Sequence, residues 1–271
     1  MRVRKLAMSL IGVFLILFVF SIITVNRKDM KKSVAASANV SLSNKKIGWG
    51  IKRNDSHAQP DLGKNNKALL DENEGIAMGN PEKKVVYLTF DEGYEAGMTP
   101  KILDVLKKNN VKAAFFITGH YLNSKPELVE RMIKEGHIVG NHTVNHYSMP
   151  DLDDNRLKEE INKLHVGVYE KFGYEMKYFR PPMGEYSERT LNITNKLGYT
   201  TVMWSFAYDD WDVNKQGRED YGKDKILSNV HPGAIILLHA TSSDNANILD
   251  HCIKEIKKMG YEFKPLNEFA P

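Results

Sequence analysis

The sequence predicts an α/β fold of parallel strands with crossover helices, preceded by an N-terminal membrane helix and a tether. After Lys84, short runs of β-branched and aromatic residues alternate with segments whose apolar residues recur at helical spacing. With 271 residues, of which 42% are hydrophobic, the chain can bury one sizeable core. An unbroken apolar stretch occupies residues 6–25. Together these observations predict one globular domain with appendages.

The apolar stretch is long enough to cross the hydrocarbon layer of a membrane, which is about 30 Å thick. Arg2, Arg4 and Lys5 precede it. We therefore predict a signal-anchor helix over residues 1–25 that holds the protein in the cell membrane. The run Ala36-Ser37-Ala38 resembles a signal-peptidase site, so secretion after cleavage behind Ala38 is the alternative.

The rest of the chain divides at two changes of composition. Residues 26–46 are polar and aperiodic, which predicts a flexible tether. Residues 47–81 carry scattered apolar residues among turn-formers, which predicts an extension packed on the main domain, residues 82–271. The single cysteine, Cys252, falls on an apolar helix position and is expected in the core.

The alternation after Lys84 predicts a regular series of elements. Proline near the first turn and glycine after the last turn mark several helix ends. The expected strands are 85–90, 113–117, 137–140, 177–180, 199–204 and 234–238. The expected helices are 100–108, 126–134, 157–168, 187–197 and 245–259.

Reactive side chains follow the ends of these strands. In parallel α/β folds, loops from many strands surround one spot at the carboxyl ends, where ligands bind. The sequence therefore predicts one site from residues that are far apart in the chain. They are Asp91, Glu92, His142, His146, Arg180, Asp209, Asp210, Trp211 and His239.

The spacing of His142 and His146 suggests a metal site. Two residues four apart project from the same side of a helical turn, so both imidazoles can reach one ion. A carboxylate from elsewhere in the fold can supply a third ligand. The alternative is that the two histidines only line a turn, because this spacing is common by chance.

Five ordered motifs of the chain resemble those of the polysaccharide deacetylases, the NodB-homology domain of carbohydrate esterase family 4. The resemblance covers about residues 82–269. It implies a distorted (β/α) barrel with fewer than eight strands. Trp49-Gly50, Tyr94-Glu95 and Ser243-Asp244-Asn245-Ala246 resemble the delta-lactam-biosynthetic de-N-acetylases of the PdaA type. The five motifs are Thr89-Phe90-Asp91-Glu92-Gly93, His142-Thr143-Val144-Asn145-His146, Arg180-Pro181-Pro182-Met183-Gly184, Asp210-Trp211 and Leu237-Leu238-His239.

The resemblance implies a metal-dependent hydrolase with a catalytic base. A divalent ion, zinc with cobalt or manganese as alternatives, would be held by Glu92, His142 and His146. Asp91 would take the proton of the attacking water, and Arg180 would orient Asp91, since a planar guanidinium suits a carboxylate. Alternatively, Arg180 could form an ordinary surface ion pair.

The other motifs imply the remaining roles. His239 would protonate the departing nitrogen, although a histidine at the end of an apolar run can also be a hydrogen-bonded core residue. The backbone N–H of Met183 would help to hold the oxyanion. Asp210 and Trp211 would contact substrate at the groove wall, or else cap a turn and pack there. Leu237 would lie against the acetate methyl.

Two positions depart from the family pattern. Glu92 stands where most members carry an aspartate as metal ligand, so the reach of the carboxylate differs. Ala207 stands at the position of the aspartate that usually orients the catalytic histidine, and Asp209 could replace it. If nothing replaces it, the tautomer of His239 is less well fixed.

The resemblance implies de-N-acetylation of N-acetylmuramic acid in peptidoglycan, on the outer side of the membrane. Where an amidase has removed the stem peptide, the freed amine can close into the muramic delta-lactam of spore cortex. The alternatives are a deacetylase of N-acetylglucosamine in peptidoglycan or chitin-like polymers, and a glycan-binding wall protein on a disabled scaffold. The net charge of +4 is spread along the chain and does not indicate a nucleic-acid-binding surface.

Overall fold

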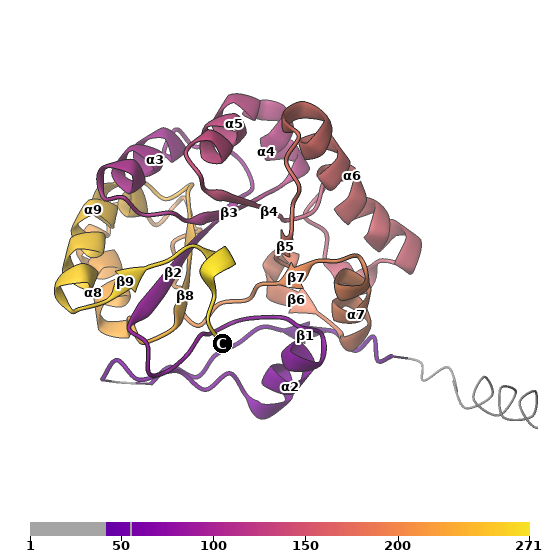
Figure 1. Ribbon diagram of the computed structural model, residues 1–271, viewed down its shortest axis with the longest axis horizontal. Helices are drawn as coiled ribbons and strands as arrows, with labels where there is room; N and C mark the ends of the chain where they lie inside the picture. Colours follow the sequence, from indigo (N-terminus) through magenta and orange to yellow (C-terminus); the bar gives the residue numbers. More distant parts are fainter. Residues whose placement is uncertain (1–41, 55) are drawn as a thin grey trace, which may run out of the picture. The chain divides into compact units, whose positions relative to one another are not determined.

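The computed structural model describes residues 42–54 and 56–271, and residues from Ser43 onwards form one compact unit (Figure 1). The predicted membrane helix and residues 26–41 of the predicted tether lie outside the described residues. Among the residues that are described, no helix combines the length and the apolar character needed to span a bilayer.

The centre of the fold is a curled sheet of parallel strands, which confirms the predicted fold class (Figure 1). Its order is β7-β5-β4-β3-β2-β8, and β9 pairs with the start of β2. The strands are β2 (Val85–Glu92), β3 (Ala114–Ile117), β4 (Ile138–Asn141), β5 (Tyr178–Phe179), β7 (Thr200–Thr201), β8 (Ala234–His239) and β9 (Glu262–Phe263).

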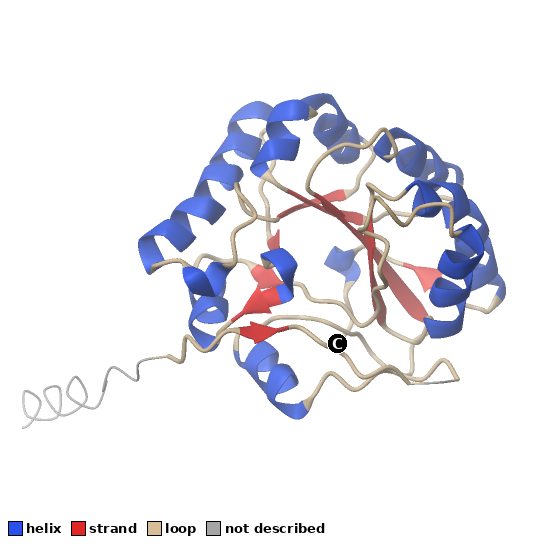
Figure 2. Ribbon diagram, turned by 180° about the vertical axis from the view of Figure 1, so that it is seen from behind, coloured by secondary structure: helices blue, strands red, loops and turns tan. Residues whose placement is uncertain are grey.

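Helices surround the outer side of the curled sheet (Figure 2). They are α3 (Thr99–Lys108), α4 (Gly119–Ser124), α5 (Pro126–Lys134), α6 (Asp154–Phe172), α7 (Glu188–Lys196), α8 (Glu219–Asn229) and α9 (Ser243–Lys258). Three short 3₁₀ turns complete this part of the chain: η1 (Met149–Asp151), η2 (Pro182–Gly184) and η3 (Leu266–Glu268).

Each strand of the curled sheet buries both faces, but the two faces meet different surroundings. Successive side chains of a strand point to opposite sides. In β2, Tyr87 belongs to the core inside the curl, whereas Phe90 belongs to the larger core beneath the helices. The inner core also contains Phe116 and Ile235. This alternation decides which polar side chains at the strand ends face the site.

The segment before β2 closes the open side of the curl. Strand β1 (Ile47–Gly48) pairs with β6 (Glu185–Tyr186), and helix α2 (Lys64–Glu72) follows (Figure 1). Ile76 bridges to Val202, and Met78 bridges to Ala234. Residues 76–78 therefore lie between the β7 and β8 sides of the sheet, where they complete its hydrogen bonding.

Most predicted elements are confirmed, and the differences have local causes. Helix α5 has the predicted bounds, and Gly173 ends α6 in a left-handed conformation. Strand β2 runs two residues further than predicted, through Glu92. The expected strand 199–204 is reduced to β7, because single bridges replace a regular ladder beyond it. Helices α2, α4 and α8 were not predicted, since they are short or carry few apolar residues.

Gly140→Ala is expected to destabilise the protein by about 1 to 3 kcal/mol, because a core already filled must expand. A Cβ at Gly140 would lie 2.5 Å from Cδ1 of Phe116 inside the curl. Urea unfolding measures the effect. Gly48→Ala is the matched control, since no neighbouring atom lies within 4 Å of its added Cβ. Equal stability of the two variants would contradict the prediction.

Candidate active site

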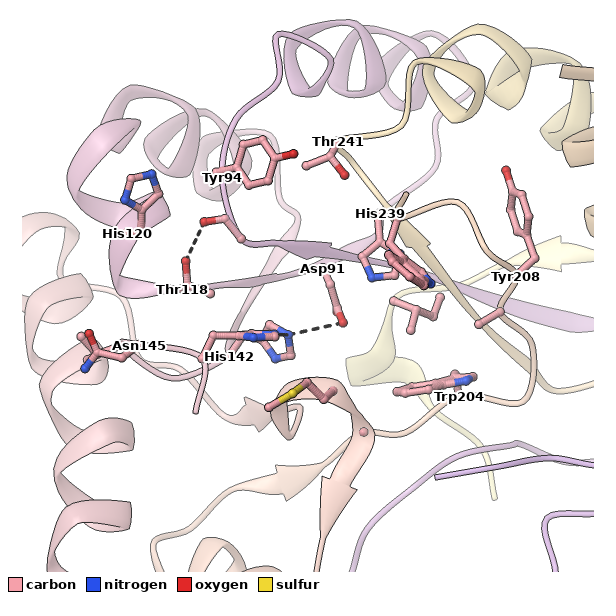
Figure 3. A pocket seen from close by; sticks show the side chains of 18 residues that line it. Asp91, Tyr94, Thr118, His120, His142, Asn145, Trp204, Tyr208, His239 and Thr241 are labelled. Carbon is pink, nitrogen blue, oxygen red and sulfur yellow. Dashed lines mark hydrogen bonds and ion pairs between the residues drawn. The ribbon is translucent and has the colours of Figure 1, made fainter. Parts of the chain in front are cut away.

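A cavity of about 1080 Å³ opens at the carboxyl ends of the strands (Figure 3). Strand β2 and strand β8 pair in register, which places Asp91 beside His239. His142 follows β4 and faces Asp91 (Figure 3). The predicted meeting of these strand ends is therefore what the structure shows. The lining includes Asp91, His142, His146, Met183, Trp211, Leu237 and His239.

Arg180 lies beneath this cavity as the largest fully buried side chain, and it binds Asp91. Its Nη1 donates to Oδ1 of Asp91 at 2.7 Å, and its Nη2 donates to the hydroxyl of Thr89 at 2.9 Å. The guanidinium also stacks on the ring of Phe116, 4.2 Å from its centroid. The alternative of an ordinary surface ion pair is therefore wrong. Arg180 fixes the orientation of Asp91 from inside the curl.

The ion pair also sets the charge of Asp91. Burial alone would raise the pKa of Asp91, but the charge and the hydrogen bond of Arg180, together with the charge of His239, outweigh burial and hold it below its ordinary value. Asp91 is thus an ionised carboxylate at neutral pH. One of its oxygens is bound to Arg180, and Oδ2 faces His142 at 3.5 Å from its Nε2.

His142 and His146 converge, but not from a helical turn as predicted. They lie in the loop after β4, where Thr143 and His146 both adopt positive φ angles, 67° and 58°. The two Nε2 atoms are 3.2 Å apart. The loop, rather than the i, i+4 spacing of a helix, brings the imidazoles together. The prediction that the two imidazoles meet is therefore confirmed, but the helical geometry given as its reason is wrong.

Helix α6 holds this loop through a buried carboxylate that sequence reasoning missed. Glu160 is 1% exposed, and it accepts hydrogen bonds from the backbone N–H of Asn145 at 2.8 Å and from its side-chain amide at 2.7 Å. Arg156 pairs with the same carboxylate. The apolar stripe of α6 marked the helix, but nothing in that pattern marked Glu160 as a partner of the loop.

Glu92 does not join the two histidines. Because Asp91 faces the cavity, the next residue of the same strand must face the other way. Among the described residues that line the cavity, Glu92 is absent. Its carboxylate lies under α3, with both oxygens 3.4 Å from the hydroxyl of Thr99. Burial and the neighbouring Glu95 raise the pKa of Glu92 well above its ordinary value. The ligand set Glu92, His142 and His146 is not assembled.

The two histidines by themselves fit a divalent cation. The Nδ1 of His142 donates to the carbonyl of Arg180 at 2.7 Å, which leaves its Nε2 free to bind a metal. Burial lowers the pKa of His142 to about 4, so the imidazole is neutral. Two nitrogens bound tetrahedrally at about 2.0 to 2.1 Å from zinc lie a little over 3 Å apart, as the two Nε2 atoms do. Among the described residues, no third side chain is placed to complete a metal site with these two histidines.

The acid end of the site is oriented by Asp210, not by Asp209. The Nδ1 of His239 donates to Oδ1 of Asp210 at 2.8 Å, and its backbone N–H donates to Oδ2 at 2.8 Å. Asp209 instead binds Arg218 and Tyr221 near the surface. The suggestion that Asp209 replaces the aspartate missing at Ala207 is therefore wrong. The prediction that Asp210 contacts substrate directly is also wrong, because Asp210 is buried behind His239.

The carboxylates around His239 favour its protonated form. Burial alone would lower the pKa of His239, but Asp210 and Asp91 raise it above its ordinary value. The imidazolium form of His239 therefore persists to higher pH than that of an ordinary histidine, and in this form it can donate a proton into the cavity. The alternative of a plain core histidine does not account for its place in the cavity wall.

Met183 and Gly184 form a tight turn at the cavity edge. Met183 has φ 59° and ψ 7°, and its side chain is exposed. A Cβ at Gly184 would lie 2.7 Å from the ring of Trp204 and 3.2 Å from Cβ of Trp49. The backbone N–H of Trp49 donates to the carbonyl of Gly184, and its indole N–H donates to the carbonyl of Trp204. The segment before the curled sheet thus supports this turn.

The walls of the cavity combine apolar and polar groups. Leu237 is buried two residues before His239, on the same face of β8, and lines the cavity floor. Trp211 and Tyr94 also line it and remain exposed, 61% and 47% respectively. His120 lines the cavity as well, and sequence reasoning missed it. Such a wall suits a ligand with both apolar faces and hydroxyl groups, as a sugar ring has.

Comparison with known proteins agrees with this geometry. The family model of the polysaccharide deacetylases matches residues 78–202. The peptidoglycan-N-acetylmuramic acid deacetylase PdaA of Bacillus subtilis is 44% identical over 226 residues, which cover 83% of this chain and 86% of PdaA. A peptidoglycan-N-acetylglucosamine deacetylase of Bacillus cereus is 35% identical over 192 residues, 69% of each chain. The structure of Bacillus subtilis PdaA, described as a family 4 carbohydrate esterase, matches with a TM-score of 0.82 and 43% identity, covering 84% of this chain and 98% of that one.

Proposed function

The chain belongs to the polysaccharide deacetylase family, carbohydrate esterase family 4, and on that premise we propose that this peptidoglycan deacetylase removes the acetyl group of N-acetylmuramic acid. One observation carries the proposal. An ionised carboxylate, two neutral imidazoles and a proton-donating histidine surround a single cavity whose outer wall bears aromatic side chains. The relative that is named for muramic acid is 44% identical to this chain over 226 residues.

The residues present supply the steps of amide hydrolysis. Asp91 removes a proton from water as the water oxygen bonds to the acetyl carbon. The N–H of Met183 donates to the oxyanion. His239 then gives its proton to the nitrogen as the C–N bond breaks, which leaves acetate and a free amine. A divalent ion held by His142 and His146 would polarise the acetyl oxygen and acidify the water.

The product chemistry leads to the finer part of the proposal. De-N-acetylation of muramic acid leaves an amine beside the lactyl carboxylate. Where an amidase has removed the stem peptide, the two can close into a delta-lactam with loss of water. We propose this role for the protein in spore cortex, with the chain held on the outer side of the cell membrane by residues 1–25.

Acetate release from peptide-free glycan strands tests the proposal. The full-length protein, supplied in turn with zinc, cobalt or manganese, is expected to release acetate, and fragment mass spectrometry should place the lost acetyl group on muramic acid. Chelation should stop the release, and added metal should restore it. Intact acetamides with every metal would contradict the proposal.

Two alternatives are outcomes of the same experiment. The relative named as an N-acetylglucosamine deacetylase favours loss of the acetyl group from glucosamine, which mass spectrometry separates from loss on muramic acid. A glycan-binding protein without turnover was suggested by Glu92 and Ala207. Because Asp210 orients His239, Ala207 no longer argues for a disabled site. Saturable glycan binding without acetate release would support that alternative.

Trp211→Ala is expected to raise the KM for glycan about tenfold, with a smaller change in kcat, because an indole that stacks on a sugar contributes about 1 kcal/mol or more. Tyr169→Ala is the matched control, since Tyr169 is 51% exposed on α6 and does not line the cavity among the described residues. Steady-state kinetics on glycan oligomers measure both. An unchanged KM for Trp211→Ala would exclude this wall as a sugar site.

Asp210→Asn is expected to move the alkaline limit of activity to lower pH. Asp210 helps to raise the pKa of His239, so the imidazolium of the native protein persists to higher pH than an ordinary histidine would. Without that carboxylate, the proton is lost earlier as pH rises. The measurement is kcat against pH, with Asp209→Asn as the control beside it. An alkaline limit equal to that of the native protein would contradict this role of Asp210.

A further inference from the structure

The run Ser243-Asp244-Asn245-Ala246 has no role in the mechanism described so far, yet it forms the first turn of α9 directly behind His239. Asn245 within it is fully buried. We propose that Asn245 is a positioning residue that holds Asp210, and through it the imidazole of His239, in the geometry needed to protonate the departing nitrogen. This inference rests on the proposed deacetylase function.

The contacts of the Asn245 amide group carry the argument. Its Nδ2 donates to Oδ2 of Asp210 at 2.6 Å and to the backbone carbonyl of His239 at 3.1 Å. The other oxygen of Asp210 accepts from Nδ1 of His239. Asn245 therefore touches both members of the pair. It restrains Asp210 on the side opposite to the imidazole, so the carboxylate cannot rotate away from it.

Tyr208 fixes which way the amide faces. An amide has a donor end and an acceptor end, whereas an ionised carboxylate only accepts. The hydroxyl of Tyr208 donates to Oδ1 of Asn245. This bond turns Nδ2 toward Asp210. Burial raises the pKa of Tyr208, which keeps its hydroxyl protonated and therefore able to donate.

The same helical turn anchors the chain that follows Asp210. The carboxylate of Asp244 accepts from the backbone N–H groups of Gly217 at 2.8 Å and Arg218 at 2.9 Å. Ser242 caps the helix by accepting from the N–H of Asn245. Asn245 thus sits on a rigid element, and the loop that carries Asp210 is tied to that element at two places.

A merely structural role for Asn245 predicts a different pattern of loss. If Asn245 only satisfied a buried carboxylate, its removal would loosen the site and impair every reaction there. If it positions the acid, only reactions that need a proton on the leaving group should suffer. An acetamide needs that proton, because an amine anion does not depart. An aryl acetate with a nitrophenolate leaving group does not need it.

The experiment compares the two substrates in the full-length protein. Asn245→Ala is expected to lower kcat on N-acetyl glycan about 10- to 100-fold with KM nearly unchanged, and to leave hydrolysis of p-nitrophenyl acetate within about twofold of the native rate. Tyr208→Phe should show the same pattern to a smaller extent. Asn247→Ala, one position outside the buried face of the same helix, is the matched control.

A second measurement does not depend on turnover. Nitrogen-15 NMR of the His239 ring, recorded at a pH where the ring is neutral, should show a single Nδ1-protonated tautomer in the native protein and a mixed or shifted form in Asn245→Ala. Equal loss of both substrates in both variants, or an unchanged His239 signal, would overturn the inference. If the native protein releases no acetate from any glycan but the His239 signal still changes, the proposed function fails and the positioning of His239 by Asn245 stands.

Discussion

Asp91→Asn is expected to lower acetate release by about three orders of magnitude or more, because it removes the base while keeping the shape of the side chain. The amide oxygen of the variant can still accept from Arg180, so the geometry should survive. Binding of metal by His142 and His146 should also survive. Product analysis on glycan strands and a titration with cobalt measure the two effects separately.

Asp209→Asn is the matched control for this change. Asp209 lies next to Asp210 in the loop between β7 and α8, but it binds Arg218 and Tyr221 near the surface and does not line the cavity. Its loss should leave the rate within about twofold, since exposed ion pairs contribute little. A rate for Asp91→Asn within tenfold of the native rate would show that another group acts as the base.

Arg180→Met is expected to reduce the free energy of unfolding by about 3 to 5 kcal/mol, because it leaves the buried Asp91 without its partner. The side chain of Arg180 is fully buried, and four protein oxygens accept its hydrogen bonds. Urea unfolding at neutral pH measures the loss. The variant should also be inactive, since Asp91 is no longer oriented.

The matched control for Arg180 is Arg131→Met on α5. Arg131 binds Asp104 and Glu135 at the protein surface, so we expect a loss of about 1 kcal/mol or less. The double variant Asp91→Asn with Arg180→Met should lose less than the sum of its parts, because the two residues interact directly. Additive losses would contradict the assigned ion pair.

The fold could be predicted from sequence because the strands follow local rules. Strand β8 and helix α5 are marked by apolar runs and proline, and their bounds agree closely with prediction. Helix α8 was missed because its stabilising contacts come from α9 and not from its own pattern. The reduction of the strand at 199–204 also depends on tertiary contacts, since residues 76–78 occupy part of its edge.

The site was predicted as a set of residues, but the role of each depends on direction. Asp91 and Glu92 are adjacent in sequence, and the two-residue period of a strand sends them to opposite faces once β2 extends through Glu92. Because the strand was predicted to end at Phe90, it was not predicted that the two carboxylates point in opposite directions. In the same way, only the three-dimensional structure distinguishes Asp210 from Asp209, because a loop has no regular period that would tell which carboxylate turns inward.

The bracing of the Met183–Gly184 turn by Trp49 has a consequence for the order in which the protein matures. A chain emerges from the ribosome or a translocon N-terminus first, so Trp49 appears long before the turn that it supports. Strand β2 likewise is synthesised long before β8, the strand with which it pairs in the sheet. Domains generally fold as whole units. In the part of this chain that the structure describes, an N-terminal fragment that ends before β8 lacks both the sheet partner of β2 and His239. Hydrolytic activity should therefore appear late and in one step, only after the last helix of the chain has been synthesised and has packed on the sheet.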